Sequence, residues 1–442
     1  MTGAVSKERS LNYLRQVKSA VMYRAVAVAA SFLAIPLMIN YLGQEQFGVW
    51  TTLLTVLTWI VFFDLGVGNG LRNKVAESLA KGETNEAGSY IASGYTLIGL
   101  IALALWGLVT AGSYFVPWQV VFNTQAIPES ALRETFQIAA FFIVLNFWIG
   151  LIGALLGAVQ RTSVVALGQL VSNLLVLALV FLLAKTTEAS ISNLALAYGV
   201  SLVTANVLLS QWFYRNRPEL RPRFYLDKRH VRPLLTVGLQ FFTIQLAVLV
   251  IFTTDKMLIT QLFGPQYVTQ YEVVFKLFSV ISFLHGLISA PLWSAYTDAY
   301  HREDFAWIRR MLRKQLIIFA GIVVAICLIA LLAQPIIGMW IGHDLAISSQ
   351  LIVVMALFVL ISTWNNVYAM FVNGIGKIKL QLYTAIVAMF VNIPLSIFFA
   401  KYTELGMSGI VVGTICSLLF AAVSLPLQVN HLIQPVLRGQ TA

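Results

Sequence analysis

Long apolar runs separated by short polar connections make up almost the whole chain. Each run has about 20 residues, the length of an α-helix that crosses the hydrocarbon core of a bilayer. The first follows Arg15 and Lys18 and has no small-residue cleavage site, which predicts a retained spanning helix. The pattern predicts an all-α polytopic membrane protein with about twelve transmembrane helices. The runs lie near residues 17–41, 47–71, 88–115, 134–158, 164–184, 190–213, 238–262, 267–292, 315–337, 349–373, 380–400 and 407–430.

The longest basic connection divides these helices into two sets of six. It is rich in Arg, Pro and aromatic residues, which suit an anionic membrane surface. We therefore expect an N-terminal lobe at 1–213, a cytoplasmic interlobe linker at 214–232 and a C-terminal lobe at 233–442.

The two halves of the chain resemble each other in hydropathy and loop chemistry. A displacement of about 221 positions places Gly43 on Gly264 and Trp50 on Tyr271. Each half has an even number of helices, so both insert in the same direction. We expect two six-helix lobes related by a pseudo-twofold axis along the membrane normal, as in parallel-repeat transporters.

Composition supports a membrane protein and excludes several other classes. Of 442 residues, 59% are hydrophobic and only 11% are charged, with a mean hydropathy of +0.82. Cys327 and Cys416 lie in apolar runs, which predicts small core residues and neither a disulfide framework nor a metal site. No phosphate-binding loop with Lys-Ser/Thr is present, so we expect no ATPase activity and no cofactor. Gly153 and Gly157 have the spacing of a close helix contact.

The net charge of +11 is explained by membrane topology without a nucleic-acid partner. Alternate connections carry nearly all of the Lys and Arg, whereas the opposite set holds only Arg133, Lys185 and Lys401. The positive-inside rule then places both termini in the cytoplasm.

A few ionisable residues lie at membrane depth, where a charge is costly and is normally kept for function. In the first half, Arg24 and Asp64 have matching depths and could form a salt bridge within one lobe. In the second half, Asp255, Lys256, Glu272 and Lys276 fall within one helical hairpin, and His285 follows them. Asp255 and Lys256 point about 100° apart on a helix. Glu272 and Lys276 are four residues apart and could neutralise each other.

Two stretches carry a resemblance to a known family. Residues 41–50 read Tyr-Leu-Gly-Gln-Glu-Gln-Phe-Gly-Val-Trp, and 64–77 read Asp-Leu-Gly-Val-Gly-Asn-Gly-Leu-Arg-Asn-Lys-Val-Ala-Glu. The hairpin adds Thr-Asp-Lys-Met-Leu-Ile at 254–259 and Pro-Leu-Trp at 291–293. The chain resembles the Wzx-type polysaccharide and O-antigen flippases of the multidrug/oligosaccharidyl-lipid/polysaccharide exporter superfamily.

The resemblance implies two lobes around a V-shaped cavity in the bacterial inner membrane. It implies a substrate, a polyprenyl-diphosphate-linked oligosaccharide, that is moved from the cytoplasmic to the periplasmic leaflet. Membrane lipid and a glycan polymerase or ligase machinery are the implied partners. The diphosphate would need cations in a wet cavity, and alternating access would move it. We assign substrate binding to Arg24, Lys256, Lys276 and His285, and ion coupling or gating to Asp64, Asp255 and Glu272.

Two other functions remain open. A cation-coupled multidrug exporter of the same superfamily would prefer acidic, aromatic pockets, whereas here the bases and acids at membrane depth are balanced. A membrane polysaccharide polymerase or ligase would need a sizeable periplasmic loop with catalytic Arg or His. The corresponding loops offer Arg133, His343 and little else, so we expect no enzyme activity.

Overall fold

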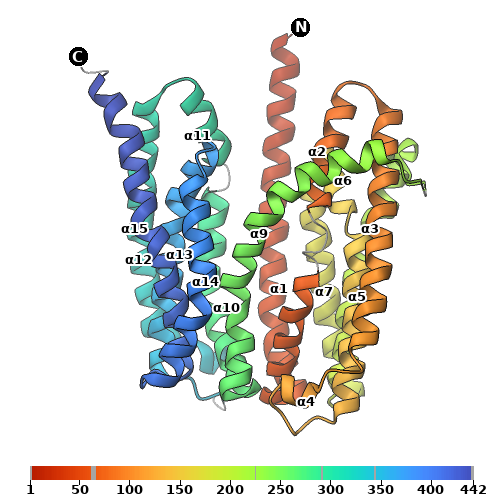
Figure 1. Cartoon of the computed structure of the whole chain (residues 1–442), viewed down its shortest axis with the longest axis vertical. Helices are drawn as coiled ribbons and strands as arrows, with labels where there is room; N and C mark the ends of the chain where they lie inside the picture. The colour runs from red at the N-terminus through yellow and green to blue at the C-terminus, as the bar shows by residue number, and fades with distance from the viewer. Residues whose placement is uncertain (1, 61–65, 224, 290–291, 343–344, 440–442) are drawn as a thin grey trace. The chain divides into compact units, whose positions relative to one another are not determined.

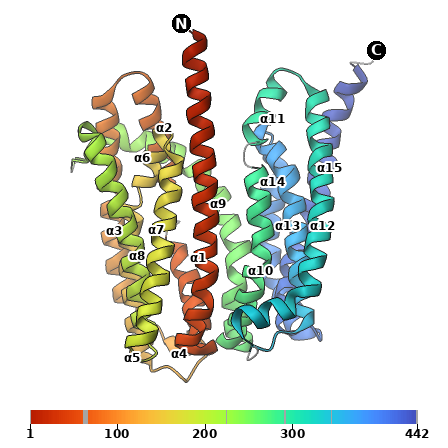
Figure 2. The same ribbon diagram turned by 180° about the vertical axis from the view of Figure 1, so that it is seen from behind.

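The computed structural model describes residues 2–60, 66–223, 225–289, 292–342 and 345–439, which are helical with no strand in those ranges. The chain divides into two compact units, Met1–Leu246 and Ala247–Ala442. The predicted linker, 214–232, lies inside the first unit, and the helix that follows it begins in the first unit and ends in the second. Figures 1 and 2 show the helices from opposite sides.

The first unit contains long helices joined by short connections, as the hydropathy pattern predicted. Its elements are α1 (Thr2–Thr58), α2 (Val67–Ala80), α3 (Thr84–Gly112), α4 (Trp118–Val121), α5 (Glu129–Ile149), α6 (Ile152–Ala158), α7 (Thr162–Thr186), α8 (Ile191–Asn216), the 3-10 turn η2 (Pro218–Leu220) and the start of α9 (Lys228–Phe263). Within it, α1 packs on α7, α5 packs on α3 and α8, and α2 packs on α3 and α6.

The second unit is built in the same way. It contains the end of α9, then α10 (Pro265–Ser289), α11 (Leu292–His301), α12 (Phe305–Ile341), α13 (Ser349–Gly374), α14 (Lys379–Tyr402) and α15 (Met407–Gly439). Here α15 packs on α13 and α14, and α13 packs on α10, α11 and α12.

Within the described ranges, the predicted apolar runs lie mostly on helices. Among the described residues, ten stretches are long and apolar enough to cross a membrane, and the first, Lys18–Thr58, is divided by a break at Gly43. In α12 the most apolar window is only 11% buried within the protein, so its side chains must meet lipid or another apolar surface. The chain is therefore a multi-pass membrane protein.

The positions at which helices begin and end show the expected repeat. Gly43, with φ 78°, reverses the chain between the first two apolar runs, and Gly264, with φ 109°, separates α9 from α10. Both lie in the left-handed region, which glycine adopts without a side-chain penalty. At the same offset of 221 positions, α3 begins at Thr84 and α12 at Phe305. The two units therefore share the course of their first three apolar runs.

Small residues bring two helices of the second unit into backbone contact. A Cβ atom on Gly413 of α15 would lie 2.3 Å from the backbone nitrogen of Ser396 in α14. The sequence pointed instead to Gly153 and Gly157, and that expectation was wrong. Gly153 has no other atom within 4 Å of a Cβ position, and Gly157 meets the Arg72 side chain instead of a helix backbone.

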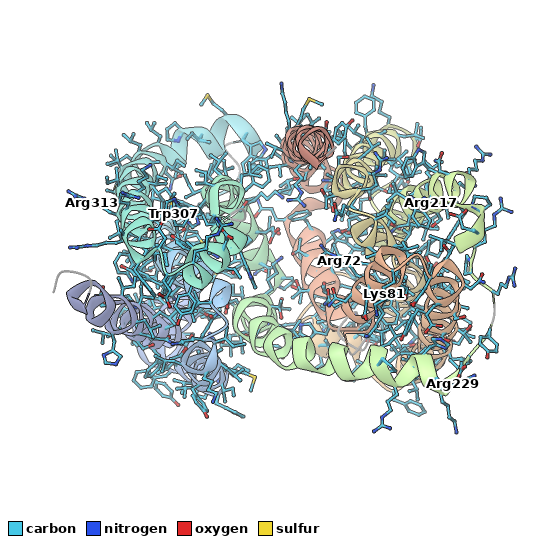
Figure 3. The ribbon with its side chains drawn as sticks, turned by 90° about the horizontal axis from the view of Figure 1, so that it is seen from above. Arg72, Lys81, Arg217, Arg229, Trp307 and Arg313 are labelled. Atoms are coloured by element: carbon cyan, nitrogen blue, oxygen red, sulfur yellow. The ribbon has the colours of Figure 1, made fainter. Side chains whose placement is uncertain are left out.

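Basic residues gather at one end of each unit, called here its basic end. In the first unit this is where α2 meets α3, close to Lys81, with Arg217 at the end of α8 and Arg229 at the start of α9. Figure 3 looks down on these residues and on Arg72 of α2. Hydrogen bonds from Lys81 and Lys74 lower the pKa of Glu77 to about 2, so this carboxylate remains charged among them. The basic end of the second unit is where α11 meets α12, and it includes Arg309, Arg310 and Arg313.

We predict that Gly413→Ala destabilises the purified protein, because the new methyl group would overlap the α14 backbone. Overpacking of this kind costs about 1–3 kcal/mol. The measurement is the apparent melting temperature in detergent. Gly321→Ala is the matched control, since Gly321 lies in α12 with no atom within 4 Å of its Cβ position. Equal melting temperatures for the two variants would contradict the prediction.

Candidate functional site

The membrane-depth charges of the second unit form a two-part site on α9 and α10. Asp255 and Lys256 are neighbours in α9, and their side chains turn to different helices. The separation of about 100° between successive helical residues produces this division. One part is a buried carboxyl group and the other is a partly exposed ion cluster.

Asp255 is sealed inside a network of hydroxyl and amide groups. Only 2% of Asp255 is exposed. Thr414 of α15 donates to its Oδ1 at 2.9 Å, and Tyr271 of α10 donates to its Oδ2 at 3.4 Å. No base lies within ion-pair distance of Asp255 among the residues that the structure describes. A carboxylate buried without a cation is costly, so this group is suited to take up a proton or a small cation.

Asn392 extends the network to α14. Its side-chain nitrogen donates to Thr414 Oγ1 at 2.9 Å and to Ser417 Oγ at 3.4 Å, while its oxygen accepts from Thr254 Oγ1 at 3.3 Å. Polar residues of α9, α10, α14 and α15 therefore meet around one carboxyl group. Sequence reasoning missed Thr414 and Asn392, because each is an uncharged polar residue within a long apolar run.

Lys256 and Glu272 form an ion pair between α9 and α10. The Lys256 Nζ to Glu272 Oε2 distance is 2.6 Å, and the side chains are 21% and 17% exposed. Lys276 lies one turn further along α10 and is half-buried. Glu272 thus pairs with a base on the facing helix, which spacing along α10 alone could not reveal. When all three are ionised, Lys256, Glu272 and Lys276 together carry one net positive charge.

The predicted set also includes Arg24, Asp64 and His285. Arg24 is an exposed residue of α1. Its expected partner, Asp64, lies outside the described residues. His285 of α10 is 3% exposed, and its Nε2 has no hydrogen-bond partner among the described residues.

A polar hollow lies at the basic end of the first unit, and the sequence did not predict it. Arg72 and Asn69 of α2 line it together with Asn146 of α5, and its volume is about 430 Å³. Asn146 accepts a hydrogen bond of 2.6 Å from Asn206 of α8, which fixes the amide. The glycine tract at 66–70 could have indicated this hollow, since small residues leave room beside Arg72. An arginine and two amides suit a phosphate or a sugar.

No group of three or more His, Cys, Asp or Glu residues that could hold a metal ion occurs in the described parts of the chain. Cys327 and Cys416 are free thiols.

Comparison with known proteins identifies the family. Residues 14–296 match the family model described as "Polysaccharide biosynthesis protein". The chain belongs to this family. A second model, MatE, matches residues 242–398. The resemblance noted in the sequence is therefore confirmed.

Relatives and a solved structure agree with this assignment. The chain is 21% identical over 412 residues to a Salmonella typhimurium protein named O-antigen transporter, covering 90% of this chain and 92% of the relative. It is also 21% identical over 366 residues to a Yersinia pseudotuberculosis protein named O-antigen export protein, covering 80% and 82%. An inward-facing multidrug resistance MATE family transporter of the MOP superfamily matches with a TM-score of 0.79 at 16% identity, over 95% of this chain and 99% of that one. This last likeness concerns the fold alone.

We predict that Lys256→Met and Glu272→Met each destabilise the protein by about 2 kcal/mol, because each leaves one partly buried charge unpaired. The double variant should recover most of the loss, since two apolar side chains replace the pair. Thermal unfolding of the purified variants measures this. Lys81→Met, in an exposed pair with Glu77, is the control and should leave the melting temperature unchanged. Additive losses in the double variant would refute the pairing.

Proposed function

We propose that the protein is a flippase for a polyprenyl-diphosphate-linked oligosaccharide, an O-antigen or exopolysaccharide repeat unit. The observation that carries the proposal is membership of the polysaccharide biosynthesis family, with relatives named for O-antigen transport along most of their length. The protein acts by alternating access and carries out no chemical conversion.

The chemistry of such a substrate fits the ion cluster on α9 and α10. A diphosphate entering an apolar layer loses hydration, and fixed cations offset part of that loss. We assign Lys256 and Lys276 to substrate binding, with Glu272 holding Lys256 and setting the net charge at one positive. We also assign Arg24 of the first unit to substrate binding, because it is an exposed base of α1. His285 is assigned the same role, because its Nε2 has no hydrogen-bond partner among the described residues and suits a sugar hydroxyl or phosphate.

We assign Asp255 to ion coupling, because its carboxyl group is buried with hydroxyl donors and no base among the described residues. Uptake of a proton or sodium ion would change the charge at the centre of four helices. Asp64 is retained as a gating residue on its sequence position alone.

The basic ends of the two units support an orientation. The positive-inside rule places them on the cytoplasmic side of the bacterial inner membrane, together with both termini. Substrate would then enter from the cytoplasmic leaflet and leave on the periplasmic side. An inside-negative potential favours that direction for an anion, by about 2.3 kcal/mol per charge per 100 mV. A glycan polymerase or ligase machinery would use the product.

We predict that Arg24→Ala and Lys276→Ala each slow translocation about tenfold, because loss of one charged contact to the diphosphate costs about 1.5 kcal/mol or more. The assay is transfer of a fluorescent polyprenyl-diphosphate sugar between leaflets of proteoliposomes. Arg313→Ala is the control, since this exposed base lies at the basic end of the second unit. Wild-type rates in both test variants would remove these residues from the mechanism, and no transfer by the wild type would reject the function.

We predict that Asp255→Asn abolishes the response of transport to imposed proton or sodium gradients while the protein still inserts. The amide has nearly the same shape and can still hydrogen-bond Thr414, but it cannot exchange a charge. Transport by wild type and variant is compared with each gradient present and collapsed. If the variant responds as the wild type does, Asp255 is not the coupling site.

A cation-coupled multidrug exporter is the second candidate, favoured by the MatE match at 242–398 and by the buried carboxyl group of Asp255. The same proteoliposomes separate the two functions. Gradient-driven accumulation of cationic dyes without sugar-lipid transfer would select the exporter.

A further inference from the structure

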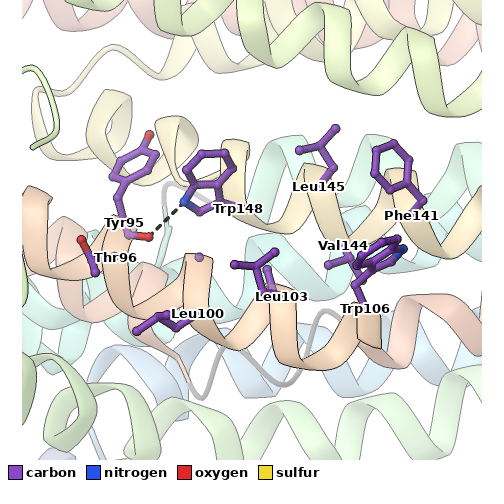
Figure 4. A pocket seen from close by; sticks show the side chains of 11 residues that line it. Tyr95, Thr96, Leu100, Leu103, Trp106, Phe141, Val144, Leu145 and Trp148 are labelled. Atoms are coloured by element: carbon purple, nitrogen blue, oxygen red, sulfur yellow. Dashed lines mark hydrogen bonds between the residues drawn. The ribbon is translucent and has the colours of Figure 1, made fainter. Parts of the chain in front are cut away.

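A lipid-sized groove runs along α3 and α5 of the first unit. Its volume is about 400 Å³, and its lining is almost entirely apolar, with Leu100, Leu103 and Trp106 on one wall and Phe141 and Leu145 on the other (Figure 4). Leu103 is 66% exposed and Leu100 is 54% exposed. Apolar side chains this exposed at membrane depth need an apolar occupant.

A basic hollow adjoins this groove. It has a volume of about 560 Å³ and shares Tyr95 and Trp148 with the groove. Arg215 at the end of α8 and Arg221 and Arg223 of the linker line it, and none of its lining residues is acidic. All three arginines are exposed, and none forms an ion pair within the described part of the chain.

Tyr95 and Trp148, which line both hollows, are held by hydrogen bonds. Trp148 Nε1 donates to the Tyr95 carbonyl oxygen at 3.0 Å (Figure 4), and the Tyr214 hydroxyl donates to the Tyr95 hydroxyl at 3.1 Å. These aromatic residues stand where the apolar lining changes to a cationic one. Trp and Tyr favour this position at a membrane interface.

The linker is held in place over the hollow by α3. The Tyr225 backbone N–H donates to Thr96 Oγ1 at 3.2 Å, and the Asp227 backbone N–H donates to Ser93 Oγ at 3.3 Å. Leu220, beside Arg221, is fully buried. The arginines therefore belong to an anchored segment.

The dimensions of the groove select the occupant. From Tyr95 to Trp106 it follows α3 for about 16 Å at 1.5 Å per residue. One leaflet of hydrocarbon is about 15 Å deep. An acyl chain with its phosphate at the basic hollow would therefore fill the groove within a single leaflet, whereas a long polyprenyl chain would overrun it.

We propose that this surface is a binding site for one anionic glycerophospholipid. Its acyl chain lies between α3 and α5, and its phosphate contacts Arg215, Arg221 and Arg223. Bound lipid links the interlobe linker to α3, α5 and α8 of the first unit. The proposal does not depend on the transported substrate.

The test uses the full-length protein in neutral phosphatidylcholine nanodiscs with a small fraction of phosphatidylglycerol that carries a photoreactive acyl chain. Crosslinks should map to residues 95–106 and 141–148. Arg215→Gln/Arg221→Gln/Arg223→Gln should reduce crosslinking at least tenfold. Arg309→Gln/Arg310→Gln/Arg313→Gln removes the same charge from the basic end of the second unit and should leave it unchanged.

A second variant tests the groove independently of charge. Leu103→Trp places an indole in the groove on an exposed, lipid-facing position and should also reduce crosslinking at least tenfold. The photoreactive phosphatidylcholine analogue should label the groove at least tenfold less than phosphatidylglycerol does.

Three results would overturn the proposal. They are equal labelling by the neutral and anionic lipids, equal loss in the two triple variants, and displacement of phosphatidylglycerol by an equimolar polyprenyl phosphate. The last result would assign the site to an isoprenoid carrier instead.

Discussion

The packing of the second unit depends on how its charged side chains find partners inside the membrane. Asp255 and Lys256 enter the bilayer side by side on α9, and neither can remain unpartnered in hydrocarbon without a large cost. Lys256 meets Glu272 on α10, and Asp255 meets Thr414 on α15. These contacts tie α9 to the next helix in the chain, α10, and to α15, which is distant in sequence. The same contacts leave a carboxyl group sealed from solvent beside an ion cluster, so the helix packing and the proposed transport chemistry depend on the same atoms.

The two halves of the internal repeat share features of backbone geometry, but their charged residues differ. Gly43 and Gly264 occupy equivalent positions and share a left-handed conformation. At the offset of 221 positions, however, Lys256 corresponds to Ile35 and Glu272 to Thr51. The first unit therefore has no counterpart of this ion cluster at those positions. Its described hollows with basic side chains lie instead around Arg72 and around the linker arginines. The same helical scaffold thus presents different polar chemistry in each unit.

The proposed lipid site lies in the first unit, where the linker meets α3. The linker that leads to α9 is fixed on α3 by Ser93 and Thr96, and it holds its arginines where a phosphate of the neighbouring leaflet can reach them. A protein that handles lipid-linked substrates must work against a background of bulk lipid. A lipid bound at the basic segment and the apolar groove would help to hold the linker in place. Such a lipid would not occupy the ion cluster of the second unit.

Much of the fold followed from the sequence, because a bilayer restricts spanning segments to apolar helices of a fixed length. Hydropathy located the spanning helices that the described ranges contain, and the spacing of Gly43 and Gly264 indicated the repeat. The sequence also identified which ionisable residues lie at membrane depth. It could not pair them. Glu272 could equally have joined Lys276 on its own helix, and only the packing of α10 against α9 brought Lys256 to 2.6 Å. Thr414 and Asn392 were invisible as site residues, because a hydroxyl or an amide in an apolar run acquires a role only when tertiary contacts bring a carboxyl group to it.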